Sequence, residues 1–196
     1  MSAVAFDPVA HRYTLDGRVL PGVTSILAPL QDFSMVNPDV LKNGQAMGTA
    51  VHRATELYDL GELDMASLSP ALVPYLDAWV NFRHECSFIP CSIEERLVHP
   101  VHGYAGTCDR TGMVDGDMAV LDIKKMVTLG PVIGVQLAAY QAMLNLDSRQ
   151  KPVTVRYALG LRADGTYRLQ KYDSPNDYAV FLSLLTIHNW KVKNGH

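Results

Sequence analysis

The chain has 196 residues, of which 48% are hydrophobic and 19% charged, and its formal net charge is −3. These values are typical of one globular domain, and we find no repeat or low-complexity segment. Three irregularly spaced cysteines exclude a disulfide framework and favour a reducing compartment. The N-terminus has no basic flank and apolar run, and no stretch is long enough to cross a membrane, so we expect no signal peptide and no membrane partner.

Residues 1–30 are expected to form a hairpin followed by a short helix. The alternation from His11 to Leu15 predicts a strand, Asp16-Gly17 predicts the turn, and Arg18 to Leu20 forms the returning strand. Thr24 is expected to cap the helix that runs to Leu30.

The next helix is expected from about Pro38 to Leu60, because Asn37 is a favourable cap and proline suits the first turn. Gly44 and Gly48 could divide it into two pieces. The elements expected after it are a helix over 70–84 beginning at Ser69 and Pro70, strands over 91–99, 104–110 and 118–124, a helix over 131–146, strands over 153–161 and 167–172, and a helix over 175–191 capped by Ser174.

The strands over 104–110 and 118–124 flank Asp115-Gly116, which is a strong signal for a tight hairpin turn. A turn centred there makes paired residue numbers sum to 231, so that Met113 faces Met118 and Asp109 faces Asp122. Directly opposed residues have Cβ atoms roughly 4.5–5.5 Å apart, and like charges placed in this way are destabilising. A bound divalent cation would relieve that repulsion, because hard cations take carboxylate oxygens.

Lys124 follows Asp122 by two residues, so both side chains are expected on one face of the strand. Two acids and a lysine on one face suit phosphodiester hydrolysis, in which a metal binds the phosphate and lowers the pKa of a water. The ammonium group can orient that water or offset developing charge. An Asp–Lys salt bridge without a metal is the competing interpretation.

The ordered set Gly106-Thr-Cys-Asp109, Asp122-Ile-Lys124 and Gln136-Leu-Ala-Ala-Tyr140 resembles the PD-(D/E)XK nuclease superfamily, and its RecB-like and phage-type exonuclease branch in particular. The resemblance implies an α/β fold with a mixed central β-sheet flanked by α-helices, the restriction-endonuclease-like core. It also implies one nuclease domain, with an N-terminal hairpin and short helix (1–30), a catalytic core (37–146) and C-terminal strands and a helix (150–196).

The resemblance implies roles for several residues. Catalysis would use Asp109, Asp122 and Lys124, and Gln136 and Tyr140, four apart on one helix face, would reach the active site and the substrate. Mg²⁺ or Mn²⁺ would be held by His52, Asp109, Asp122, Glu94 and the backbone carbonyl of Ile123. No iron–sulfur cluster is expected, because the four-cysteine cluster of some relatives needs cysteines after Cys108.

Two site residues keep a competing interpretation. His52 lies four residues after Gly48 in a G-x-x-x-H pattern that carries a metal ligand in the RecB-like branch, and a half-buried, hydrogen-bonded histidine is the competing interpretation. Relatives carry a glutamate on the strand before the G-T-x-D motif. Glu94 fits that position, and Glu95 competes with it because adjacent strand residues point to opposite faces.

A net charge of −3 means that any DNA path must be a local basic patch, and we select Arg53, Arg110 and Lys125 as its candidates. The predicted function is metal-dependent DNA hydrolysis in phage-type recombination, repair or DNA processing, in bacterial or phage-infected cytoplasm, with exonuclease action favoured. The alternatives are a structure-selective endonuclease and a non-catalytic or partner-dependent DNA-binding protein. A recombinase or single-strand-annealing partner, or a homo-oligomer, could supply additional contacts with DNA.

Overall fold

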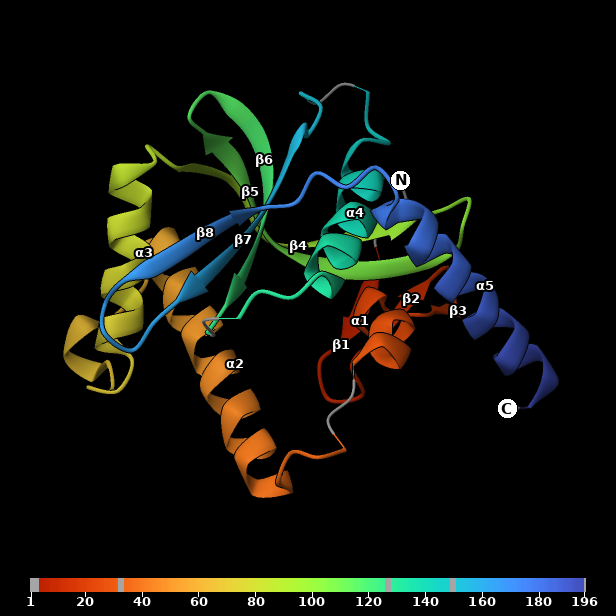
Figure 1. Cartoon of the computed structure of the whole chain (residues 1–196), viewed down its shortest axis with the longest axis horizontal. Coiled ribbons are helices and arrows are strands. Elements are labelled where there is room, and N and C mark those ends of the chain that lie inside the picture. Colours follow the sequence, from red (N-terminus) through yellow and green to blue (C-terminus); the bar gives the residue numbers. More distant parts are fainter. Residues whose placement is uncertain (1–3, 32–33, 126–127, 149–150, 196) are drawn as a thin grey trace.

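The computed structural model describes residues 4–31, 34–125, 128–148 and 151–195 (Figure 1). Its main sheet has five strands in the spatial order β4-β5-β6-β7-β8. Neighbouring strands are antiparallel except β6 and β7, which are parallel because α4 (Val132–Leu144) connects them as a crossover. The expected mixed α/β fold is confirmed. The five strands are Ile89–His99 (β4), Tyr104–Val114 (β5), Asp117–Lys124 (β6), Val155–Leu161 (β7) and Tyr167–Lys171 (β8).

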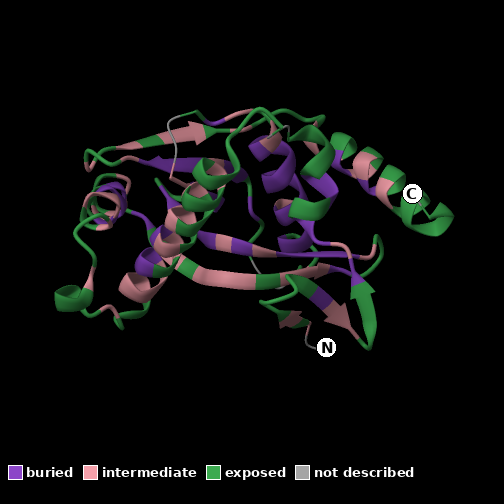
Figure 2. Cartoon of the chain, turned by 90° about the horizontal axis from the view of Figure 1, so that it is seen from below, coloured by how far each residue is buried: buried purple, intermediate pink, exposed green. Residues whose placement is uncertain are grey.

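Helices cover both faces of this sheet. The helices α2 (Pro38–Leu60) and α3 (Val73–Glu85) pack on one face, whereas α1 (Val23–Leu27), α4 and α5 (Asp177–Asn194) pack on the other. Strand β6 is therefore buried on both sides, with Val120 in the cluster under α4 and Leu121 in the cluster under α3 (Figure 2). The apolar run in this strand correctly predicted a buried central strand.

The N-terminal segment forms a three-stranded sheet, β1 (Ala5–Asp7), β2 (Arg12–Leu15) and β3 (Arg18–Leu20), where we predicted two strands. Tyr13 packs with Leu20 and Ala105, which attaches this sheet to the start of β5. The predicted cap at Thr24 is wrong, because the helix begins at Val23 and Thr24 lies within it. A 3₁₀ helix over Ala28–Leu30 follows.

Helix α2 begins and ends where the sequence predicts. Asn37 Oδ1 accepts hydrogen bonds from the backbone of Asp39 and Val40, and Gly61 ends the helix with φ 72°. The two glycines do not divide it. Its buried residues, Val51, Ala54 and Thr55, all lie in its second half. The first half therefore extends away from the sheet (Figure 1).

Other boundaries shift by a few residues. Helix α3 starts at Val73, after a 3₁₀ helix at Met65–Ser67, and α5 is preceded by Asn176 where we predicted Ser174 as the cap. The domain boundary predicted at residue 150 lies outside the described residues. No helix in the described part of the chain combines the length and apolar character that crossing a membrane requires.

Candidate active site

The hairpin that carries Asp109 and Asp122 has the predicted register. Met113 pairs with Met118, and Arg110 with Leu121, so paired residue numbers sum to 231. The ladder ends at this last pair, one step before Asp109 and Asp122. Asp109 Oδ2 instead accepts a hydrogen bond from the backbone N of Ile123 at 2.7 Å. The side chain of one strand thus binds the main chain of the next where their regular pairing stops.

The regular alternation of β5 also breaks at Asp109. Cys108 packs in the cluster under α4, whereas Arg110, two residues later, reaches Asp59 of α2 on the opposite face of the sheet. Residues two apart on a regular strand share a face, so the strand is locally irregular here. On β4, Glu94 lies between the pairs Ile93–Arg110 and Glu95–Cys108 and has φ 48°. A left-handed glutamate is uncommon and often marks a functional site.

His52, Glu94 and Asp109 converge from α2, β4 and β5. His52 Nδ1 lies 3.8 Å from Glu94 Oε1 and 3.7 Å from Asp109 Oδ1. These separations are too long for hydrogen bonds. Two donors that share one cation at about 2.1 Å lie at most about 4.2 Å apart, so both distances fit a shared metal ion. One ligand atom from each residue lies within 4.8 Å of the others.

The structure distinguishes the two candidate glutamates by position. Glu94 is the one beside His52 and Asp109, whereas Glu95 pairs with Cys108 on β5.

Asp122 is 1% exposed and lies beside this group, held by two residues from our predicted set. Lys124 Nζ and Gln136 Nε2 both donate hydrogen bonds to Oδ1, at 2.9 and 3.0 Å. Gln136 Nε2 is also 3.3 Å from the hydroxyl of Tyr140. Burial raises the pKa of Asp122, as does the charge of Asp109, and the ammonium group of Lys124 opposes this shift.

Asp122 Oδ2 supports the presence of a cation site. Lys124 Nζ lies 2.8 Å from this oxygen, but the contact lacks hydrogen-bond geometry, so the buried oxygen has no hydrogen-bond partner among the described residues. The ion pair with Lys124 compensates the charge of this carboxylate, and coordination to a metal would supply the partner that Oδ2 lacks. The donor set of one imidazole and two carboxylates at His52, Glu94 and Asp109 therefore fits a divalent cation, and Asp122 lines the same groove.

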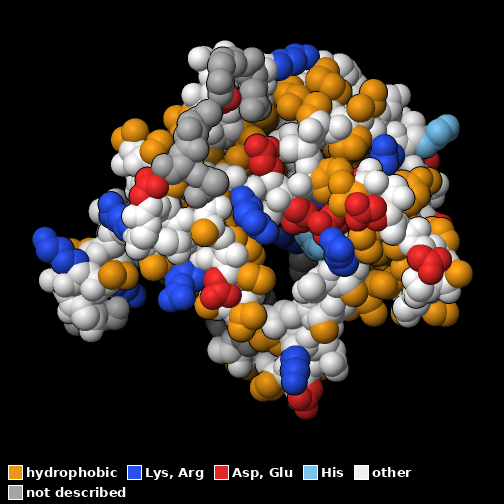
Figure 3. Space-filling view, turned by 180° about the vertical axis from the view of Figure 1, so that it is seen from behind, with side chains coloured by type: hydrophobic (Ala, Val, Ile, Leu, Met, Phe, Trp, Pro, Cys, Tyr) orange, Lys and Arg blue, Asp and Glu red, His pale blue; other side chains and the backbone are white. Residues whose placement is uncertain are grey.

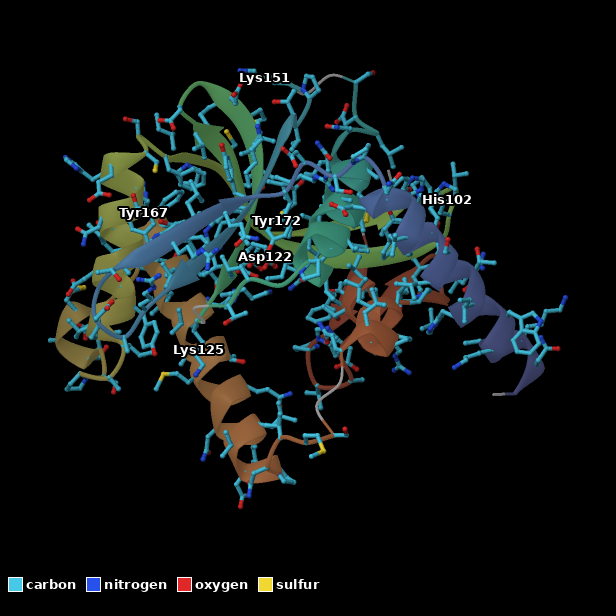
Figure 4. The ribbon with its side chains drawn as sticks, in the orientation of Figure 1. His102, Asp122, Lys125, Lys151, Tyr167 and Tyr172 are labelled. Carbon is cyan, nitrogen blue, oxygen red and sulfur yellow. The ribbon has the colours of Figure 1, made fainter. Side chains whose placement is uncertain are left out.

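A groove of about 1060 Å³ contains these groups. It is lined by His52, Glu94, Asp109, Asp122, Ile123, Lys124, Lys125, Gln136 and Tyr140 from the predicted set. Figure 3 shows acidic, histidine and basic side chains gathered beside a hollow in this face of the molecule, and Figure 4 labels Asp122 near the centre of the fold and Lys125 toward α2.

Two predicted DNA contacts lie outside this groove. Arg53 is exposed and forms an ion pair with Glu56 at 2.8 Å. The prediction that Arg110 contacts DNA is wrong, because its side chain is fully buried and its donors are used internally. Arg110 donates to Asp59 (2.7 Å), Glu94 (3.1 Å), Thr55 (3.3 Å) and the backbone oxygen of Asp109 (2.6 Å).

The Arg110 network links the elements that carry the candidate ligands. Thr55 Oγ1, which accepts from Arg110, also donates to the backbone oxygen of His52 at 2.9 Å. Asp59 Oδ1 further accepts from Trp79 and Arg83. The sequence analysis missed Thr55 and Asp59. Their spacing of three and seven residues from His52, which places all three on one helix face, was the available signal.

The charges around His52 predict a pH-dependent metal affinity. Burial lowers the pKa of His52, but the carboxylates of Asp109 and Glu94 outweigh this effect and raise the pKa to about 9. A metal needs the neutral imidazole, so Mn²⁺ affinity should rise about tenfold per pH unit between pH 6.5 and 8.5. Calorimetric titration at each pH checks this, and an affinity that is constant over the range contradicts it.

The same shift affects the stability of the metal-free protein in the opposite direction. The folded-state pKa lies above the ordinary histidine value of 6.5, so protonated His52 stabilises the fold fully below pH 6.5. This stabilisation is lost as the pH rises through about 9.

No protein-family model matches the sequence, and no curated protein matches it. Among solved structures, a provisionally assigned exonuclease from Eubacterium rectale aligns with a TM-score of 0.53 and 13% identity, over 76% of this chain and 68% of that chain. The alkaline exonuclease LHK-Exo from Laribacter hongkongensis aligns with a TM-score of 0.41 and 14% identity over 74% and 82% of the two chains. The structure of LHK-Exo in complex with dAMP aligns with a TM-score of 0.41 and 16% identity, over 90% of this chain and 93% of that chain. The first of these similarities shows that this chain shares the fold of the Eubacterium rectale protein.

Proposed function

We propose that this protein is a metal-dependent deoxyribonuclease that hydrolyses DNA phosphodiester bonds. The observation that carries the proposal is the convergence of His52, Glu94 and Asp109 beside the buried Asp122–Lys124 pair in an open groove. Phosphodiester hydrolysis needs both a cation site and a positive side chain beside the phosphate. The exonuclease assignment of the Eubacterium rectale protein agrees with this, although a fold does not by itself specify a function.

The proposed roles follow from the contacts of each residue within the catalytic part, residues 37–146. Lys124 Nζ, held by Asp122, would orient the attacking water or offset charge that develops on the phosphate. Gln136 and Tyr140 would hold Asp122 and orient the substrate. A bound divalent cation supplies charge neutralisation at the phosphate and a water of lowered pKa. The groups proposed to hold Mg²⁺ or Mn²⁺ are His52, Glu94, Asp109, Asp122 and the carbonyl of Ile123.

The proposed substrate is DNA with a free end, in phage-type recombination, repair or DNA processing. Lys124 and Lys125 line the groove, and Arg53 is exposed on the same helix as His52. Affinity for DNA phosphates draws on positive charge, and the net charge of this chain is −3. A recombinase, a single-strand-annealing protein or a second copy of the chain would therefore supply further contacts with DNA. Endonuclease action at the same site is the alternative.

Replacing Lys124 with alanine is expected to lower DNA cleavage at least a hundredfold, because the charge that faces the phosphate is lost. The assay compares end-labelled linear DNA with closed circular DNA in Mg²⁺, Mn²⁺ or EDTA. Lys193→Ala, in the last turn of α5 and remote from the groove, is the matched control and should cleave like wild type.

The outcomes separate the proposed activities. Metal-dependent loss of linear DNA alone supports an exonuclease, and the released label gives its polarity. Cutting of closed circles identifies an endonuclease that uses the same site. Failure of the wild type to cleave any DNA or RNA with either metal contradicts the proposal for the isolated protein.

A further inference from the structure

The groove extends from the candidate metal site to a region whose chemistry is different. One wall is the face of α2 that carries Leu41, Gly44 and Gly48, and the other wall includes Phe6, His11 and Val23 from the N-terminal segment and α1. Tyr13 attaches this second wall to the sheet, because its hydroxyl is 2.9 Å from Thr107 Oγ1 on β5. This region, which we call the outer groove, is continuous with the site at His52.

Charge is confined to the inner end. Among the described residues that line the groove, the acidic and basic side chains are Glu94, Asp109, Asp122, Lys124 and Lys125. The outer groove is lined by apolar, aromatic and neutral polar side chains and by glycine, and its titratable side chains among those described residues are His11 and Tyr13. A duplex is gripped mainly through its phosphates by lysine and arginine, and an outer groove of this composition offers no such contacts.

Two glycines in α2 keep the outer groove open. Gly44 and Gly48 are one turn apart on the groove face, inside a long helix where glycine is destabilising. A Cβ atom added at either position meets no other atom within 4 Å. Close packing within the chain therefore does not require these glycines. Their effect is a smooth wall and free space next to the site.

We infer that the outer groove binds the unpaired bases of a single strand whose phosphodiester lies at the metal site, so that the substrate is a single-stranded end or overhang. Base faces are apolar, which suits the apolar composition of these walls. Phe6 is partly exposed in these walls, and its position is fixed by Tyr13, with ring centroids 4.7 Å apart, and by the guanidinium carbon of Arg96, which lies over its ring at 5.5 Å. This inference rests on the proposed nuclease function and specifies its substrate.

The test measures binding without cleavage, by fluorescence anisotropy of a labelled single-stranded oligonucleotide and of a blunt hairpin duplex in EDTA at equal salt. Wild type should bind the single strand at least tenfold more tightly than the duplex. Its salt dependence should be shallow, with a slope of log affinity against log salt of about −1.4, because two lysines contact phosphate. Equal or tighter binding of the duplex overturns the inference.

Gly44→Leu tests the groove itself. The leucine side chain should fill the outer groove and lower single-strand affinity at least tenfold, while a better helix former raises the urea midpoint of unfolding. Phe6→Ala should weaken binding at least fivefold, because the groove loses apolar contact with the base. Val19→Ala, exposed on the same N-terminal sheet and outside the groove, is the matched control and should bind like wild type. Wild-type affinity in Gly44→Leu overturns the inference.

The two proposals can fail separately. A protein that binds single strands through the outer groove but cleaves nothing retains this inference and contradicts the nuclease proposal. A protein that degrades DNA with wild-type binding in Gly44→Leu retains the nuclease and overturns the outer-groove assignment.

Discussion

Replacing Glu94 with glutamine is expected to lower metal-dependent DNA cleavage at least a hundredfold. Glutamine keeps the shape of the side chain and can still accept the hydrogen bond from Arg110, so the fold should be retained. The negative charge beside His52 and Asp109 is lost, and even residues that contact metal ligands indirectly typically contribute 10–100-fold to metal affinity. Titration of the cleavage rate with Mn²⁺ should show a large rise in the metal concentration required.

The neighbouring Glu95 provides a close control. It belongs to the same strand and has the same side chain, but it pairs with Cys108 and lies outside the group that could hold a metal. Glu95→Gln should therefore cleave DNA at close to the wild-type rate. Equal losses in the two variants, or a larger loss in Glu95→Gln, would contradict the assignment of Glu94 as a metal ligand.

Replacing Arg110 with methionine is expected to destabilise the protein by about 3–5 kcal/mol, the usual cost of removing one partner of a buried ion pair. Arg110 and Asp59 are both 0% exposed and lie 2.7 Å apart, so the substitution leaves a buried carboxylate with less compensation. Urea unfolding monitored by circular dichroism measures this loss. Arg53→Met, which removes an exposed arginine two residues before Thr55, should change the urea midpoint little.

Arg110 should also affect metal binding, because it positions the candidate ligands. It donates to the side chain of Glu94 and to the backbone of Asp109, and methionine can replace neither contact. In Arg110→Lys, which keeps the charge but not the planar set of donors, stability should recover more than Mn²⁺ affinity. Full recovery of Mn²⁺ affinity in Arg110→Lys would contradict this positioning role, because it would show that the positive charge alone is sufficient.

Local chemistry explains why some elements were predictable. Asp115 and Gly116 have φ 48° and 90°, as a tight hairpin turn requires, and this turn alone sets the register between β5 and β6. Asn37 and Pro38 likewise determine where α2 starts, through a side-chain cap and a favourable first turn. Short-range signals of this kind do not depend on the rest of the fold.

Thr24 and Ser174 show the limit of such signals. Both are good capping residues in sequence, but the helices begin at Val23 and Asp177, and neither Thr24 nor Ser174 is the N-cap. Packing of these helices against the sheet sets their boundaries, and it overrides a preference that is worth only about 1 kcal/mol.

The sequence by itself determined the hairpin register, because turn chemistry is a local property, and its motifs implied, through their resemblance to a nuclease superfamily, the mixed α/β architecture and the acids, lysine and glutamine that gather in the groove. Tertiary structure decided which glutamate joins His52 and whether Arg110 is exposed. The first depends on a break in strand alternation opposite Glu94, and the second on Asp59, 51 residues away along the chain. The outer groove also exists only in the folded chain, because its walls come from separate segments that pack against a common sheet.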